Sequence, residues 1–187
     1  MGERYKFHST EKLYFVTTTV IRWIDVFTRE PYRKIVIDSI NYCIANKGLR
    51  VYAWVLMTNH IHMLVGTEDE PLSYIYRDWK KFTSKALTAA IAENERESRE
   101  WMIKMFRSAG RKNPANQFVQ FWQQGNHPLE INSEQFLIRA IRYIHQNPVK
   151  AGFVNNPEDW KYSSIHAYMD KPSEIITIPA MDLMFCG

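Results

Sequence analysis

Residues 51–66 form an apolar run that is rich in β-branched and aromatic side chains and breaks only near Thr58 and Asn59. Such a run predicts two short strands joined by a turn at those residues. His60 and His62 lie two positions apart in the second strand, so both point to the same face of a sheet, roughly 6 to 7 Å apart. Two neutral imidazoles so placed can share a divalent metal with a third ligand from elsewhere. The competing interpretation is that each is a half-buried strand residue with a satisfied hydrogen bond.

The segments on either side of this hairpin predict the remaining elements. In chain order, the predicted elements are a strand at residues 13–21, a helix at 32–46, the hairpin, a helix at 72–90, a strand at 117–123 and a helix at 134–146 or slightly beyond. This order is β-α-β-β-α-β followed by an extra helix, the order of the ferredoxin-like split βαβ fold. We therefore expect an α+β fold whose four-stranded antiparallel sheet carries helices on one face and leaves the other face free for a site.

The composition limits the chain to one compact domain. A chain of 187 residues with 45% hydrophobic residues can bury one core but not two full ones. Cys43 and Cys186 form no spaced pair, so neither a disulfide framework nor a cysteine zinc site is expected. No window approaches the apolar length of a membrane span. We expect a cytoplasmic protein without a membrane partner.

The net charge of +4 favours a polyanionic partner if the positive residues cluster. Residues 101–112 combine cations with aromatic and methionine side chains and contain no acidic residue. This mixture is typical of a nucleic-acid groove, although the end of an amphipathic helix has the same pattern. The candidate phosphate-binding residues of this cluster and of the second helix are Lys80, Lys81, Lys85, Lys104, Arg107, Arg111 and Lys112.

The last predicted helix presents two polar side chains away from its main apolar stripe. On a helical wheel Leu137, Ile141 and Ile144 share one arc, whereas Tyr143 lies on the other side. Asn147 follows Tyr143 by one turn, so a phenol and an amide are presented together. On these residues alone, the alternative is a half-buried tyrosine and an asparagine near the helix end.

Four segments occur in order and at suitable spacing along the chain. They are residues 55–65 (VLMTNHIHMLV), 121–125 (FWQQG), 140–154 (AIRYIHQNPVKAGFV) and 157–164 (PEDWKYSS). Together they resemble the REP-associated tyrosine transposases and the related single-tyrosine HUH transposases of bacterial insertion sequences. The resemblance extends from about Tyr14 to Tyr168, and it implies one domain over residues 1–170 followed by a C-terminal tail at 171–187.

The resemblance implies an enzyme that cleaves and rejoins DNA strands, with the nucleophilic tyrosine on the extra C-terminal helix. Matched residue by residue, His60 and His62 correspond to the metal ligands of the HUH motif, Tyr143 to the nucleophile, and Asn147 to a further metal ligand. A divalent ion, Mg²⁺ or Mn²⁺, would polarise the scissile phosphate while Tyr143 forms a covalent phosphotyrosine link. Thr58 stands where members often have proline, and Asn147 where some relatives have glutamine.

The expected partner is single-stranded or hairpin DNA, and Lys150, after the tyrosine, adds to the phosphate-binding residues. The chain is compatible with a monomer or a homodimer. A zinc hydrolase is an alternative, but it would need further ligands at motif spacing, which His8, His127, His145 and His166 do not supply. A nucleic-acid-binding module that has lost catalysis would keep only the fold and the basic surface.

Overall fold

The computed structural model describes residues 7, 12–94, 100–111, 119–125 and 127–179. Within these residues it contains a sheet of four strands in the order β2-β3-β1-β4, with every neighbouring pair antiparallel. The strands are β1 (Tyr14–Thr19), β2 (Leu49–Leu56), β3 (His60–Thr67) and β4 (Leu129–Glu130). The α-helices are α1 (Glu30–Lys47), α2 (Leu72–Glu93), α3 (Glu100–Arg111) and α4 (Glu134–Lys150). Three short 3₁₀ helices are η1 (Ile21–Trp23), η2 (Pro157–Asp159) and η3 (Ser164–Met169). The predicted α+β class and four-stranded antiparallel sheet are confirmed.

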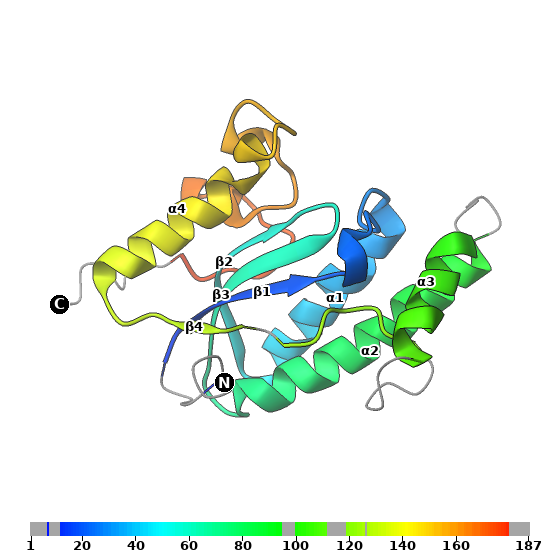
Figure 1. Cartoon of the computed structure of the whole chain (residues 1–187). Coiled ribbons are helices and arrows are strands. Elements are labelled where there is room, and N and C mark those ends of the chain that lie inside the picture. Colours follow the sequence, from blue (N-terminus) through cyan, green and yellow to red (C-terminus); the bar gives the residue numbers. More distant parts are fainter. Residues whose placement is uncertain (1–6, 8–11, 95–99, 112–118, 126, 180–187) are drawn as a thin grey trace.

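The sheet has two faces, with α1 and α2 on one side and α4 on the other (Figure 1). Helices α1 and α2 cover one face and form the main core with it, including the sheet residues Tyr14, Val16, Trp54, Leu56, Ile61, Met63 and Val65. Helix α4 lies against the other face, where Leu137, Ile141 and Ile144 pack on Ala53, Val55 and Leu64 in a smaller cluster. The second face is therefore only partly covered by apolar packing, which leaves room for polar groups beside α4.

Helix α1 has clear start and stop residues. Pro31 occupies its first turn, where the missing N–H costs no hydrogen bond. Gly48 ends the helix in the left-handed conformation, with φ of 69°. A Cβ atom at Gly48 would lie 2.6 Å from a carboxylate oxygen of Asp69, so a larger residue would also have to displace that side chain.

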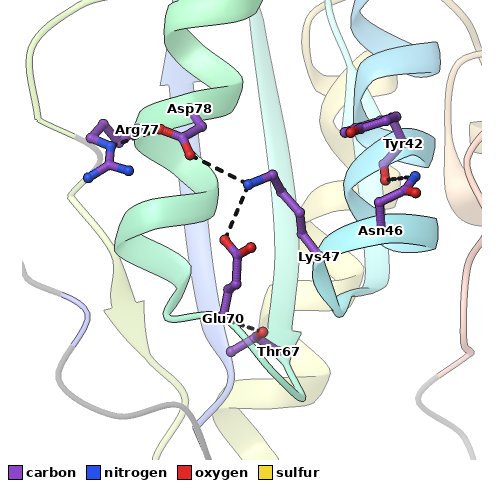
Figure 2. Close-up of polar contacts among 7 residues, drawn as sticks. All are labelled: Tyr42, Asn46, Lys47, Thr67, Glu70, Arg77 and Asp78. Carbon is purple, nitrogen blue, oxygen red and sulfur yellow. Dashed lines mark hydrogen bonds and ion pairs between the residues drawn. The ribbon is translucent and has the colours of Figure 1, made fainter.

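The end of α1 is tied to the start of α2 by an ion-pair network (Figure 2). The Lys47 Nζ atom lies 3.2 Å from Oε2 of Glu70 and 3.5 Å from Oδ2 of Asp78, and Asp78 also accepts from Arg77. These contacts link the last residue of α1 to the first turns of α2 and to the segment just before it.

Ser133 caps the N-terminus of α4, because its hydroxyl accepts a hydrogen bond from the backbone N–H of Phe136 at 3.2 Å. The helix continues through Pro148 to Lys150. Pro148 removes one intrahelical hydrogen bond, yet the N–H of Ala151 still bonds the carbonyl oxygen of Asn147 at 2.9 Å. The helix therefore runs about two turns past Tyr143 and ends a little beyond the predicted end at residue 146.

The predicted fourth strand at residues 117–123 is wrong, because β4 is Leu129–Glu130. Residues 117 and 118 lie outside the described residues, and only Trp122 makes an isolated bridge, to Val20. Phe121 and Trp122 are both buried, and the indole N–H of Trp122 bonds the Thr83 hydroxyl at 2.9 Å. The segment still pairs with the chain just after β1, because the N–H of Ile21 bonds the carbonyl oxygen of Phe121 and the N–H of Gln123 bonds that of Thr19, but this pairing is too short to form a strand.

Part of the predicted tail packs on the domain. Ile175 is fully buried, and the N–H of Ile178 bonds the carbonyl oxygen of Val51 at 2.9 Å. Residues 180–187 lie outside the described residues. Among the helices that the structure describes, none is both long and apolar enough to cross a membrane.

Candidate active site

Two histidines of β3 meet at the α4 side of the sheet. The ring centroids of His60 and His62 are 4.6 Å apart with the rings nearly perpendicular, at 76°. In the β1–β3 register they lie opposite Thr19 and Thr17. Because both histidines belong to the same strand, the geometry of β3 holds the two imidazole rings close together.

His62 is the more deeply buried of the two, with 5% of its surface exposed. Its Nδ1 atom lies 2.7 Å from the hydroxyl of Thr17, and its ring stacks on Phe15 at 5.4 Å. Burial, with a smaller effect of the neighbouring His60, lowers the pKa of His62 to about 3. Near neutral pH the ring is uncharged and keeps a lone pair.

His60 is oriented by a chain of hydrogen bonds. The Asn59 amide nitrogen lies 2.9 Å from Oδ1 of Asp25 and 3.2 Å from the carbonyl oxygen of Trp23. Both of these atoms only accept, so the amide nitrogen must face them and the amide oxygen faces Nδ1 of His60, at 2.7 Å. Nδ1 therefore carries the proton and Nε2 keeps the free lone pair. Burial lowers the pKa of His60 to about 4, opposed in part by the Asp25 carboxylate.

Tyr143 approaches the same pair from α4. Its ring centroid is 5.2 Å from that of His62 and 5.8 Å from that of Phe15, and 41% of the residue is exposed. The Lys150 ammonium lies 5.5 Å from the centroid of the ring on the same helix. A phenol open to solvent, two neutral imidazoles and a cation are thus gathered where β3 meets α4.

The donor set of this site fits a divalent metal. Two uncharged imidazoles, one of them held in the Nδ1–H tautomer, are suitable ligands. Among the described residues no three His, Cys, Asp or Glu side chains converge on one point. Asn147 is half-buried on α4 one turn after Tyr143, and its amide oxygen is of a suitable kind.

A family comparison gives this geometry its context. Residues 9–147, most of the chain, match the family model described as IS200-like transposase. The chain belongs to the IS200-like transposase family. This membership covers β1 to β4 and most of α4, including His60, His62 and Tyr143.

A solved structure gives an independent comparison for this transposase. A REP-associated tyrosine transposase, solved bound to a REP hairpin, superposes with a TM-score of 0.64 at 18% sequence identity. The match covers 97% of this chain and 94% of that chain, so the fold is shared over nearly the full length of both. No curated protein matches the chain.

The structure brings the two predicted cationic clusters of the transposase together. α2 and α3 border a groove of about 930 Å³, and the segment 119–124 forms its floor. The predicted residues that line it are Lys80, Lys81, Lys85 and Arg107. Lys104, Arg107 and Arg111 line a neighbouring hollow of about 390 Å³ along α3. Lys112 lies outside the described residues.

Lys80 is the least exposed cation of the groove. Its ammonium donates to the carbonyl oxygen of Gln123 at 2.8 Å, and burial lowers its pKa to about 8. Lys150 lies apart from this groove, beside Tyr143. The positive residues therefore occupy two locations, one on the outer helices and one next to the histidine pair.

Sequence reasoning missed the groups that orient the histidines and border them, namely Phe15, Thr17, Trp23, Asp25 and Asn59. The strand alternation of residues 13–21 could have placed Thr17 on the histidine face, since both it and His62 are central strand residues. Asn59 directly precedes His60, which was a usable signal. Asp25 and Trp23 reach the site through a loop, and no periodic pattern indicates that contact.

Proposed function

We propose that this transposase cleaves and rejoins single-stranded DNA through a covalent phosphotyrosine intermediate formed by Tyr143. The observation that carries the proposal is the 5.2 Å approach of the Tyr143 ring to His62 on the open side of the sheet. The residue is 41% exposed, so the phenol is open to a substrate from solvent. Family membership supports DNA cleavage and rejoining as the class of reaction.

In the proposed reaction the Tyr143 hydroxyl oxygen attacks the phosphorus of the scissile phosphodiester. A bond forms between that oxygen and phosphorus, the bond to the 3′ oxygen breaks, and the tyrosine proton is lost while the 3′ oxygen gains one. The phosphate ester is conserved on the tyrosine, so a 3′ hydroxyl can later attack it and reverse the step. Strand transfer therefore needs no external energy source.

Charge at the phosphate is the main obstacle to this attack. A bound divalent ion would supply Lewis-acid stabilisation of the charge that develops on the phosphate oxygens. His60 and His62 would hold it through their free ring nitrogens, with Asn147 as the third protein ligand. Imidazole donors favour Mn²⁺ over Mg²⁺, because Mg²⁺ prefers a site made of oxygen ligands alone. Lys150, beside the tyrosine ring, adds a positive charge where the phosphate would bind.

The proposed substrate is hairpin DNA with a single-stranded segment. The structural neighbour was solved with a REP hairpin, and it shares the fold over 97% of this chain. The groove between α2 and α3 is lined by Lys80, Lys81, Lys85 and Arg107, cations that can neutralise a phosphate backbone. Recognition would thus use a cationic surface that is separate from the histidine pair.

A covalent-adduct assay tests the proposal. Labelled hairpin DNA is incubated with the protein and Mn²⁺, and the products are separated on a denaturing gel. Tyr143→Phe keeps the aromatic ring, so folding should be affected by no more than about 1 kcal/mol, whereas the adduct and the 3′ hydroxyl product should disappear. Tyr42→Phe is the matched control, because Tyr42 is 60% exposed on α1, on the far side of the sheet.

Other outcomes identify the competing functions. An adduct that persists in Tyr143→Phe would assign the nucleophile to another tyrosine, with Tyr162 and Tyr168 the first to examine. Cleavage without an adduct in the wild-type protein would identify water as the nucleophile and a hydrolase as the function. DNA binding without any cleavage would identify a binding module of the same fold.

A further inference from the structure

Two adjacent residues beside the histidine pair have an unusual backbone conformation. Arg22 and Trp23 both have positive φ angles, 54° and 56°, although neither is glycine. Left-handed conformations are costly for residues with a Cβ atom, and a bulky tryptophan gains no local hydrogen bond from its side chain there. Such strain persists only when surrounding contacts impose it, and it concentrates at functional sites.

The contacts that impose it come from the turn before His60. The N–H of Val20 bonds the carbonyl oxygen of Asn59, and the N–H of Phe27 bonds that of Thr58, both at 2.8 Å. The Thr58 hydroxyl donates to Oδ1 of Asp25 at 2.6 Å, and the Asn59 amide donates to the carbonyl oxygen of Trp23. The loop is therefore locked to the strand that carries the histidines.

The locked loop holds Trp23 in an exposed position at the edge of the candidate metal site. Its ring centroid lies 5.6 Å from that of His60, in an edge-to-face arrangement, and 57% of the residue is exposed. The loop thus presents a large aromatic face to solvent directly beside His60, where it is free to stack on a bound ring.

Trp23 lines a hollow that a second exposed tryptophan also borders. The hollow has a volume of about 540 Å³, within the usual range of small-molecule sites, and its lining includes Trp23, Trp101, Met102 and Met105. Trp101, at the start of α3, is 48% exposed. Arg22 is anchored here by a contact of 3.0 Å between its Nη1 atom and the Met105 sulfur. Aromatic faces, thioethers and a guanidinium all favour contact with a flat, electron-rich ring.

We propose that this hollow binds an unpaired nucleobase of the single-stranded DNA next to the phosphate held at the histidine pair, with the base stacked on Trp23. The inference rests on the proposed function, since it places the scissile phosphate at His60 and His62. Stacking requires a free base face, which a paired base inside a duplex does not offer. The site therefore selects single-stranded DNA beside the hairpin, and the α2–α3 groove is left to contact the backbone.

Binding without catalysis tests the inference. The affinity of a fluorescein-labelled oligodeoxythymidylate is measured by anisotropy in chelator, so that no strand is cut. Trp23→Ala should weaken binding by about five- to 100-fold, the range supported by base–aromatic stacking, and Trp23→Phe should restore most of it. Tyr42→Ala, which removes an equally exposed ring from α1, should bind like the wild-type protein.

A second measurement localises the base. Hairpin DNA with a single-stranded extension is prepared with one abasic position at a time. At one position the wild-type protein should lose affinity, and Trp23→Ala should show no further loss there, because base and ring are removed as a pair.

The outcomes separate this inference from the proposed function. Wild-type affinity in Trp23→Ala would overturn the stacking site while leaving the Tyr143 chemistry intact. Weakened binding by Trp23→Ala without any covalent adduct in the wild-type protein would support the stacking site and refute the phosphotyrosine mechanism. Failure of the wild-type protein to bind the oligonucleotide would overturn the stacking site alone, because the adduct assay with hairpin DNA decides the Tyr143 chemistry separately.

Discussion

The two faces of the β-sheet are made from the same strands, yet they bury different chemistry. Toward α1 and α2, β3 contributes Ile61, Met63 and Val65, none more than 2% exposed, to a core that is almost entirely apolar. Toward α4, the same strand contributes His60 and His62 to a face that also carries hydroxyl and amide groups. Alternation along one strand thus separates residues that stabilise the fold from residues that can do chemistry.

Buried histidines make the stability of the α4 face depend on pH. Burial lowers the pKa of both histidines well below 6.5, so the folded protein resists their protonation. An apolar pair at these positions would pack without that penalty. The core under α1 and α2 supplies the stability that allows the α4 face to keep polar residues and a partly exposed tyrosine.

The largest expected effect is a loss of catalysis at the α4 face without a loss of folding. Replacing His60 and His62 together by alanine should lower the rate of adduct formation roughly 10³-fold or more, because the ligands of the proposed metal are removed. Circular dichroism should show a folded protein, and binding of hairpin DNA in chelator should change little. Equal cleavage by the wild-type protein with and without chelator would contradict the metal assignment.

A substitution in the core under α1 and α2 should have the opposite effect, lowering stability without lowering catalysis. Ile40 is 1% exposed on α1 in the main core, and Ile40→Ala should lower the free energy of unfolding by about 2 to 5 kcal/mol. The rate of adduct formation per folded molecule should match the wild type, since the cavity lies across the sheet from Tyr143. Urea unfolding and the gel assay measure the two quantities. A large rate loss at full folding would show that the faces are coupled.

The pH dependence of stability provides a third comparison, because the buried His62 lies on the α4 face. Between pH 6.5 and about 3 the unfolded chain protonates His62 and the folded protein does not, so unfolding takes up a proton and stability falls as the pH falls. His62→Gln should reduce this slope by about 1.4 kcal/mol per pH unit between pH 4 and 6. Urea unfolding in chelator at several pH values measures it. An unchanged slope would mean that His62 is accessible to protons in the folded state.

The smallest expected effect concerns the outer surface of α2. With a pKa of about 8, Lys80 should lose its charge between pH 7 and 9, and DNA affinity should fall by about tenfold or less over that range. Lys80→Arg keeps the charge and should remove most of this dependence. Anisotropy titrations at constant salt measure the affinity. Identical pH profiles for the two proteins would show that Lys80 does not contact DNA.

Local sequence patterns were sufficient for much of the fold and for part of the site. The helical period of apolar residues placed α1, α2 and α4, because each helix buries one stripe, and a continuous run of β-branched and aromatic residues placed the hairpin. Strand periodicity put His60 and His62 on one face, and the helical wheel separated Tyr143 from the apolar arc. These features depend only on neighbours along the chain.

Other features were decided by the tertiary structure. Residues 117–123 have strand composition, but the structure pairs Trp122 with Val20 only as an isolated bridge, and the strand beside β1 is Leu129–Glu130. The orientation of His60 through Asn59 and Asp25, the strained loop that places Trp23 beside it, and the joining of the α2 and α3 cations in one groove all join residues distant in sequence. Contacts of this kind are chosen by competition for burial and hydrogen-bond partners across the whole chain, which no local period records.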